Sequence, residues 1–164
     1  MNTNKYSTGA VFSECNSYRY VLWMEWDKSK PQVMFIGLNP STADQTNDDP
    51  TISRCINYAK SWGFGNIYMV NIFSYKTTYP KELQSATKPI GQETNDWIKK
   101  IYDSSEMCIA AWGNNGQFLN RSDEIRKLLP KMHCLKKTKS GEPSHPLYLK
   151  ASLKPIVYTY TLII

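Results

Sequence analysis

The chain has 164 residues, of which 41% are hydrophobic and 13% aromatic, so it can bury a substantial core as one globular domain. No apolar run approaches the roughly 20 residues that a membrane span requires. The N-terminus also lacks the apolar segment of a signal peptide. We therefore expect a cytoplasmic protein without a membrane partner.

The net charge of +6 comes from the last quarter of the chain. Residues 1–120 hold 11 basic and 11 acidic side chains, whereas residues 121–164 hold nine basic side chains against three acidic ones. A basic C-terminal face of this kind suits a polyanion such as nucleic acid or a nucleotide. The alternative is a solvated, lysine-rich face that only favours solubility. The basic residues are Arg121, Arg126, Lys127, Lys131, Lys136, Lys137, Lys139, Lys150 and Lys154.

The four cysteines are far apart in sequence, and no two have the spacing of zinc or iron–sulfur ligands. Three of them fall inside apolar segments, where a free cysteine packs as a small hydrophobic residue. We expect buried thiols, no bound metal and no cofactor. The cysteines are Cys15, Cys55, Cys108 and Cys134.

The first elements in chain order are a flexible segment over residues 1–17 and strands over 18–24 and 33–38. A short turn joins these strands, which predicts an antiparallel pair at one edge of a sheet. Residues 33–36 are four consecutive apolar residues. A short apolar run bounded by a turn indicates a strand buried on both faces, as in a parallel sheet.

A helix is expected to begin after Asp49, because a carboxylate cap is followed by proline at the first helical position. Apolar residues then recur at the spacing of one helical face, and Gly63 ends the helix. Residues 67–73 form the next apolar strand. A strand–helix–strand unit predicts that this strand is parallel to residues 33–38 through a right-handed crossover.

The alternation of helix and strand patterns continues to the end of the chain. It predicts a three-layer α/β/α sandwich around a mainly parallel sheet of about four strands, with the N-terminal antiparallel strand at its edge. We expect one α/β domain over residues 18–156 and a C-terminal tail over 157–164, whose last residues are either a further strand or disordered. The later elements are a short helix near 81–85, a helix over 92–102, a strand over 107–112, a helix over 115–129 and a strand over 132–135.

Four loops should meet at the edge where active sites of open α/β sheets lie, beyond the carboxyl ends of the strands. They are residues 39–49, the segment that begins at Asn71, residues 112–115 and residues 138–147. The chain has no phosphate-binding glycine loop, no nucleophile elbow and no histidine pair for zinc. Of the two histidines, His133 falls in a predicted strand and is expected to be structural. His145 lies in a loop rich in glycine and proline, where a positioned imidazole is expected.

Five blocks of the sequence, in order, resemble the family known as domain of unknown function 1643. The resemblance covers about residues 18–156 and implies no established chemistry. The blocks are residues 35–44, 48–52, 62–65, 70–71 and 141–149.

A more distant resemblance concerns chemistry. Gly37-x-Asn39-Pro40 resembles the first motif of the uracil-DNA glycosylase superfamily, in the version with asparagine in place of aspartate or glutamate. The segment His145-Pro146-Leu147 resembles its second motif. Asn71 falls where that superfamily has a base-reading asparagine. The resemblance implies the fold of that superfamily and the cleavage of N-glycosidic bonds.

The resemblance also implies a role for each residue. Asn39 would orient water toward the sugar carbon, and His145 would donate a hydrogen bond to the developing oxyanion of the departing base. Asn71 would pair with the base edge while an aromatic ring stacks on the base. The candidates for that ring are Trp62, Phe64 and Trp112.

The sequence departs from the superfamily pattern in three places. Ser41 replaces the glycine that often follows the proline of the first motif. The acidic insertion with Asp44, Asp48 and Asp49 has no counterpart there. Asp49 is expected to be the helix cap, whereas Asp44 or Asp48 is a candidate general base, metal ligand or partner of a ribose hydroxyl. Leu147-Tyr148-Leu149 replaces the usual small residues, so uracil specificity is not implied.

We therefore expect an N-glycosidase-like enzyme that acts on a base in nucleic acid or on a nucleotide or nucleoside. The catalytic candidates are Asn39, His145, Asp44 and Asp48. One alternative is a non-catalytic nucleotide or nucleic-acid binder, and another is an interaction protein with an acidic partner. The expected substrate contacts come from Gly37, Leu38, Pro40, Ser41, Thr42, Asp49, Arg54, Asn71, Trp112, Gly113, Lys139, Pro146 and Tyr148.

Overall fold

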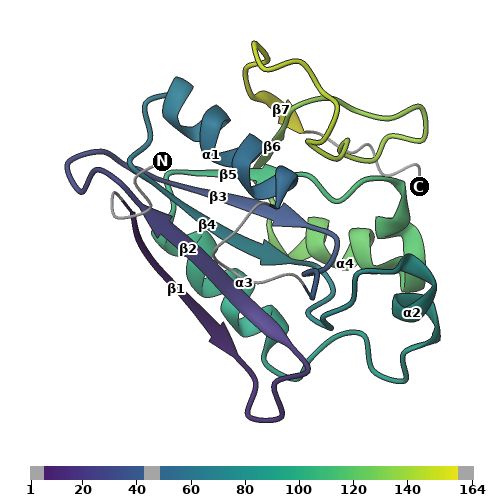
Figure 1. The fold of residues 1–164 in the computed structure, drawn as a ribbon. Coiled ribbons are helices and arrows are strands. Elements are labelled where there is room, and N and C mark those ends of the chain that lie inside the picture. The colour runs from purple at the N-terminus through teal and green to yellow at the C-terminus, as the bar shows by residue number, and fades with distance from the viewer. Residues whose placement is uncertain (1–5, 43–48, 159–164) are drawn as a thin grey trace.

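The computed structural model describes residues 6–42 and 49–158, which form an α/β structure around a seven-stranded mixed sheet (Figure 1). The strand order is β1-β2-β4-β3-β5-β6-β7. The elements in chain order are β1 (Ser7–Phe12), β2 (Arg19–Glu25), β3 (Gln32–Gly37), α1 (Pro50–Ser61), β4 (Asn66–Asn71), α2 (Pro80–Ser85), α3 (Thr94–Ser104), β5 (Met107–Ala110), a 3₁₀ segment (Asn114–Asn120), α4 (Arg121–Leu128), β6 (Met132–Cys134) and β7 (Ile156–Tyr158).

The centre of the sheet is parallel, as the sequence predicts. Strand β3 pairs in parallel with β4 on one side and with β5 on the other, and β6 continues the parallel set. The four residues Val33–Ile36 of β3 are fully buried. A strand with apolar side chains on both faces belongs in the middle of a sheet covered on both sides, which is where β3 lies.

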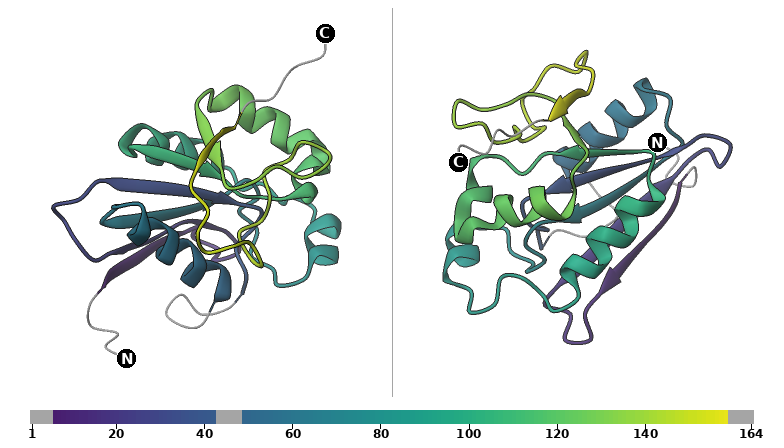
Figure 2. Two further views of the ribbon diagram at one scale, coloured as in Figure 1. Left: turned by 90° about the horizontal axis from the view of Figure 1, so that it is seen from above. Right: turned by 180° about the vertical axis from the view of Figure 1, so that it is seen from behind.

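Two apolar clusters cover the two faces of the sheet. On one face, Cys55, Tyr58 and Ala59 of α1 pack against alternate residues of β3 and β4 such as Phe35 and Ile67. The other face packs against α3 and α4 and includes Ile98, Ile101 and Ile125 (Figure 2). Helices on both faces of the sheet give the expected three layers.

The predicted antiparallel pair between residues 18–24 and 33–38 is wrong. Strand β2 pairs with β1 and with β4, and β4 lies between β2 and β3. The crossover through α1 brings β4 directly beside β3, so β2 has to pair with the outer edge of β4. Residues 7–12, expected to be part of a flexible segment, form the edge strand β1.

The C-terminal third also differs from the prediction. Leu119 and Asn120 have φ angles of 56° and 55°, so the helix expected over 115–129 is divided into the 3₁₀ segment and α4. Tyr158, assigned to the tail, is buried in β7, which pairs antiparallel with β6. Whether the last residues form a strand lies outside the described residues.

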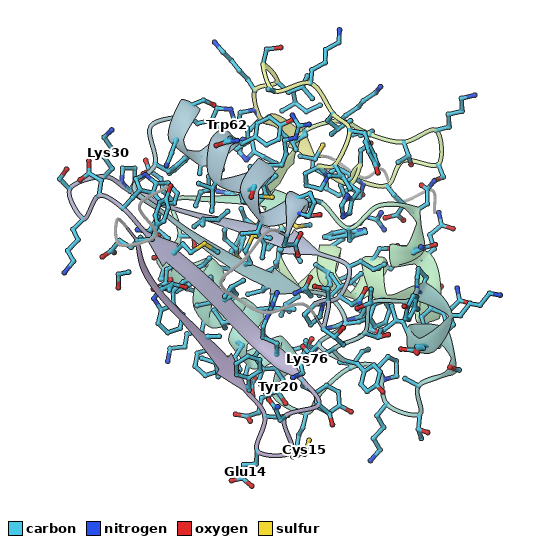
Figure 3. All side chains as sticks on the ribbon, in the orientation of Figure 1. Glu14, Cys15, Tyr20, Lys30, Trp62 and Lys76 are labelled. Carbon is cyan, nitrogen blue, oxygen red and sulfur yellow. The ribbon has the colours of Figure 1, made fainter. Side chains whose placement is uncertain are left out.

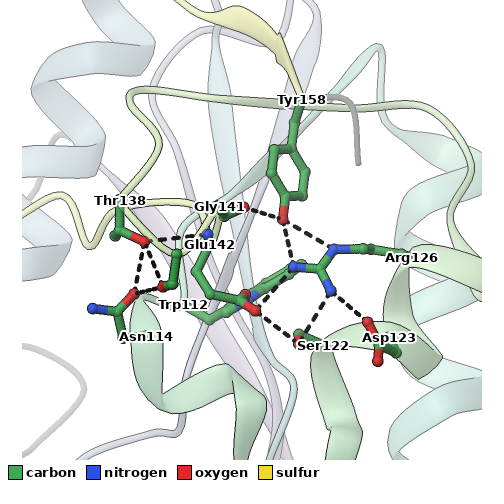
Figure 4. A network of polar contacts seen from close by, with 10 residues as sticks. Trp112, Asn114, Ser122, Asp123, Arg126, Thr138, Gly141, Glu142 and Tyr158 are labelled. Atoms are coloured by element: carbon green, nitrogen blue, oxygen red, sulfur yellow. Dashed lines mark hydrogen bonds and ion pairs between the residues drawn. The ribbon is translucent and has the colours of Figure 1, made fainter. Parts of the chain in front are cut away.

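A buried polar network holds the loop after β6 against the sheet (Figure 4). Glu142 is only 3% exposed, and its carboxylate accepts hydrogen bonds from Trp112 Nε1 at 2.7 Å and Ser122 Oγ at 3.1 Å. The guanidinium of Arg126 pairs with the same carboxylate at 3.0 Å and donates to the Tyr158 hydroxyl at 2.6 Å. The loop that carries Glu142 is thus joined to the end of β5, to α4 and to β7.

Replacing Glu142 with alanine should remove the acceptor of the buried Trp112 Nε1 and Ser122 Oγ donors, while Asp123 still pairs with Arg126 at 2.8 Å. We expect the free energy of unfolding, measured by urea denaturation, to fall by about 1–3 kcal/mol because buried donors lose their partner. The control, Asp103→Ala, breaks the exposed Lys99–Asp103 pair and should cost less than about 1 kcal/mol. Equal losses in the two variants would contradict a stabilising role for the network.

Candidate functional site

The candidate site lies at the carboxyl edge of the adjacent strands β4, β3 and β5. Gly37 at the end of β3 is in register with Asn71 at the end of β4. The pairing continues beyond the strands, because Phe73 N donates to Leu38 O and Thr77 N donates to Pro40 O. The segments that follow β3 and β4 therefore remain side by side, as the sequence predicts for loops at this edge.

Asn71 presents a buried amide beside Gly37. A Cβ atom placed on Gly37 would lie 2.7 Å from Asn71 Oδ1, so only glycine leaves the amide in its present position. Asn71 is 7% exposed, and its side chain has no hydrogen-bond partner within residues 6–42 and 49–158. Buried amides are nearly always hydrogen-bonded, which makes this amide a candidate ligand contact.

Asn39 has a side-chain orientation fixed by two carbonyl groups. Its Nδ2 donates to Thr77 O at 2.8 Å and to Pro40 O at 3.2 Å. A carbonyl oxygen can only accept a hydrogen bond, so the Asn39 side-chain atom that contacts both carbonyls must be the nitrogen Nδ2. Asn39 Oδ1 is the remaining acceptor, and it can hold a water molecule or another donor.

His145 lies beside the end of β5, because a Cβ atom placed on Gly113 would lie 3.8 Å from His145 Cβ. Gly113 has a φ of 76°, which favours glycine, and its N–H donates to Pro143 O at 2.7 Å. The Nδ1 atom of His145 accepts a hydrogen bond from Leu147 N at 3.2 Å. The proton of the neutral ring is therefore on Nε2, which is a hydrogen-bond donor.

The charge state of His145 depends on two opposing effects. Desolvation by the surrounding protein lowers the pKa of His145 below its ordinary value, and the negative charge of Asp49 opposes that shift. The result is a neutral donor at neutral pH.

Asp49 has the role of helix cap that the sequence predicts. Its Oδ1 accepts from Thr51 N at 2.8 Å and from Ile52 N at 3.4 Å, and Pro50 begins α1. Its charge also acts on His145 and on Arg19 of β2. The cap of α1 therefore lies within electrostatic reach of the candidate site.

The three aromatic rings proposed to stack on a base are unsuitable. Trp112 is buried and bound through Nε1 to Glu142, and Phe64 is part of the core. Trp62, which is labelled in Figure 3, is the C-cap residue of α1. It stacks on Phe35 and Tyr58, and its Nε1 donates to Leu153 O. Trp62 and Phe64 belong to the apolar cluster under α1, and Trp112 belongs to the cluster on the other face of the sheet, so all three rings are part of the core.

Tyr148 has the exposure that a stacking ring requires. It is 91% exposed, lies three residues after His145, and has a φ of 72°. The other substrate candidates differ in access: Pro40 and Pro146 are buried, Leu38, Ser41 and Arg54 are half-buried, and Thr42 and Lys139 are exposed. Asp44 and Asp48 lie outside the described residues.

Arg19 is a residue that the sequence reasoning missed. It is 6% exposed, its Nε has no hydrogen-bond partner, and no ion pair joins it to another described residue. Its backbone N–H donates to Ser74 O, three residues beyond Asn71, so it borders the same edge of the sheet. The available signal was a charged residue at the start of an otherwise apolar strand.

The basic C-terminal face is smaller than the sequence suggests. Arg121 is buried, donates to Ile72 O and pairs with Glu124, while Arg126 belongs to the Glu142 network. These two arginines stabilise the interior and cannot contribute to a basic surface. The exposed basic residues of this region are Lys127, Lys131, Lys136, Lys137, Lys139, Lys150 and Lys154.

Two searches of the described residues give negative results. Over residues 6–42 and 49–158, no three His, Cys, Asp or Glu side chains are grouped so that they could hold a metal ion. In the same part of the chain, every helix is too short or too polar to cross a membrane.

Comparison with family models matches residues 19–147 to the family described as "Protein of unknown function (DUF1643)". No curated protein and no solved structure gives a significant match, and none of the comparisons links the chain to the uracil-DNA glycosylase superfamily. The matched residues make up more than half of the chain and include Asn39, Asn71 and His145. The chain therefore belongs to the DUF1643 family.

Proposed function

We propose that the protein is an N-glycosidase-like enzyme that acts on a base in nucleic acid or on a nucleotide or nucleoside. The observation that carries the proposal is the complementary hydrogen bonding of two side chains. Asn39 has an acceptor, Oδ1, left over, and His145 has a donor, Nε2–H, left over. Hydrolysis of an N-glycosidic bond needs an acceptor that holds water and a donor that stabilises the departing base.

In this reaction the bond between the sugar carbon and the base nitrogen breaks, and its electron pair leaves with the base. Asn39 Oδ1 orients the water whose oxygen forms the new bond to the sugar carbon. His145 Nε2–H donates to the negative charge that develops on the base. An amide is too weak a base to take the proton of the water, so Asp44 or Asp48 is the candidate for that step.

Recognition of the base is assigned to Asn71 and Tyr148. The Asn71 amide carries both donors and an acceptor, like the edge of a base, and it has no described partner that competes. Tyr148 supplies an exposed ring for stacking. The exposed lysines between residues 127 and 154 support an anionic substrate, and a uracil-DNA-glycosylase-like fold remains part of the proposal.

A non-catalytic nucleotide or nucleic-acid binder is the alternative function. It is favoured by the engagement of Asp49, whose Oδ1 already accepts two backbone hydrogen bonds. Asp49 is therefore occupied as the cap of α1 and is not a candidate to take the proton of the water. The same residues would then bind a nucleotide without cleaving it.

Base release is the direct test of catalysis. The wild type should release a free base from at least one member of a panel of nucleosides, nucleotides and oligonucleotides with normal, damaged and modified bases. We expect His145→Ala to lower kcat about 10²- to 10³-fold, as the loss of one oxyanion donor does, and Asn39→Ala to lower it comparably. Chromatography of the released base measures both effects.

His133→Ala is the matched control, because His133 lies in β6 and is the other histidine of the chain. It should retain the wild-type kcat. If the wild type binds a member of the panel but releases no base from any, the alternative of a binding protein replaces the enzyme.

The titration of His145 can be predicted in sign. Because its folded pKa lies below the ordinary histidine value, the unfolded chain binds more protons between the two values. His145 should therefore contribute full stability above about pH 6.5, and that contribution should decrease as the pH falls toward the folded pKa. NMR titration of the imidazole should give a pKa below that of a histidine in an unfolded peptide.

Asp49→Asn should lower the His145 pKa further, because it removes the charge that opposes the shift. Asp103→Asn on α3 is the control and should leave the His145 pKa unchanged. An increase in the His145 pKa on removing Asp49 would contradict this electrostatic assignment.

A further inference from the structure

We infer that Arg19 is an anion-recognition residue of the candidate site and that the ligand is a phosphomonoester, such as a free nucleoside monophosphate. This inference deepens the proposed function and rests on it for the base-bearing part of the ligand. Its physical basis is a buried cation that the described protein leaves unpaired.

The guanidinium of Arg19 is an expensive group to bury without a partner. Arg19 is 6% exposed and its Nε has no hydrogen-bond partner. The two terminal nitrogens form no hydrogen bond or ion pair with a described residue and, unlike Nε, are not fully shielded from solvent, so a ligand can reach them. The other two arginines with low exposure are fully engaged: Arg121 with Ile72 O and Glu124, and Arg126 with Glu142. Among the arginines of low exposure in the described residues, Arg19 is thus the one without a protein partner.

Asp49 compensates Arg19 only in part. Burial lowers the pKa of Arg19, and the charge of Asp49 opposes this shift. The Asp49 carboxylate is not within ion-pair distance, since no salt bridge joins it to Arg19, and its Oδ1 is occupied by the N–H groups of α1. The donors of Arg19 are therefore still available.

The position of Arg19 connects it with the base-reading residues. Its backbone pairs with Ser74, in the segment that continues from Asn71. Two buried, unpartnered polar side chains thus border the same edge of the sheet, one a cation and the other an amide. A ligand that satisfies both would present an anionic oxygen to the guanidinium and a polar edge to the amide.

The burial of Arg19 distinguishes a terminal phosphate from a polymer backbone. A phosphodiester has a sugar on each side, which prevents close approach to a guanidinium that has little accessible surface. A phosphomonoester is bonded to one sugar only and presents three oxygens, which suit the planar fork of arginine. The geometry therefore favours free nucleotides over an internal site in a nucleic-acid strand.

The experiment compares the affinities of matched ligands by calorimetry. AMP, GMP, CMP and UMP are each compared with the corresponding nucleoside, with inorganic phosphate, and with a short oligonucleotide whose two ends lack phosphate. We expect at least one monophosphate to bind the wild type roughly 10- to 100-fold more tightly than its nucleoside, as a hydrogen-bonded charge allows. The oligonucleotide should have no such advantage.

Arg19→Met and Arg19→Lys separate recognition from folding. Methionine fills a similar space without a charge, so the Tm of the unliganded Arg19→Met variant should equal or exceed that of the wild type. Both variants should lose most of the preference for the monophosphate, because lysine lacks the planar fork. Lys28→Gln, at an exposed lysine in the turn between β2 and β3, is the matched control and should keep the preference.

Each outcome decides one of the two proposals. The role of Arg19 would be overturned if the wild type bound nucleosides and monophosphates with equal affinity. It would also be overturned if Arg19→Met kept the preference for the monophosphate, or if the Tm of unliganded Arg19→Met fell below that of the wild type. Tight binding of the oligonucleotide would overturn the choice of a monoester. A preference for monophosphates without base release would support Arg19 and contradict the glycosidase, whereas base release from nucleosides and nucleotides at equal rates would do the reverse.

Discussion

The parallel register of β3 against β4 is the constraint on which the rest of the candidate site depends. It aligns Gly37 with Asn71 at the carboxyl edge of the sheet, and the absence of a side chain at Gly37 leaves room for the Asn71 amide. Close packing favours this register, since a slip by one residue would move Val33 and Phe35 into the cluster that now holds Met34 and Ile36. Packing of the core thus determines the chemistry at its edge.

Buried polar contacts, rather than strand pairing, hold the loop that carries His145 in place. The loop that carries His145 has little regular structure, yet Glu142 joins it to Trp112, Ser122 and Arg126. The Gly113 N–H adds a direct hydrogen bond from the end of β5 to Pro143 O. A loop held in this way can position an imidazole with a precision that loops ordinarily lack.

The sequence predicts the local and central features of the fold better than the long-range ones. The apolar run of β3, the Asp49 cap and the parallel crossover depend on neighbouring residues or on chain handedness, and the structure confirms them. Strands that are distant in sequence compete for the same edge, and β2 pairs with β4 instead of β3. The short turn between β2 and β3 therefore led to the wrong prediction of an antiparallel pair. Arg121 and Arg126 were assigned to a basic surface because composition does not report burial. Arg19 was missed for the same reason.

The backbone conformation of Tyr148 costs free energy that its contacts in the folded chain do not recover. A tyrosine in the left-handed region is less favourable than a glycine there by roughly 1–2 kcal/mol, and a ring that is 91% exposed recovers little of this by packing. Strained residues of this kind cluster at sites that bind ligands. Because the backbone at Tyr148 already sets the direction of the Cα–Cβ bond, only rotation about the side-chain bonds is lost when a ligand stacks on the ring. Part of the affinity for a ligand would then be present in the protein before the ligand arrives.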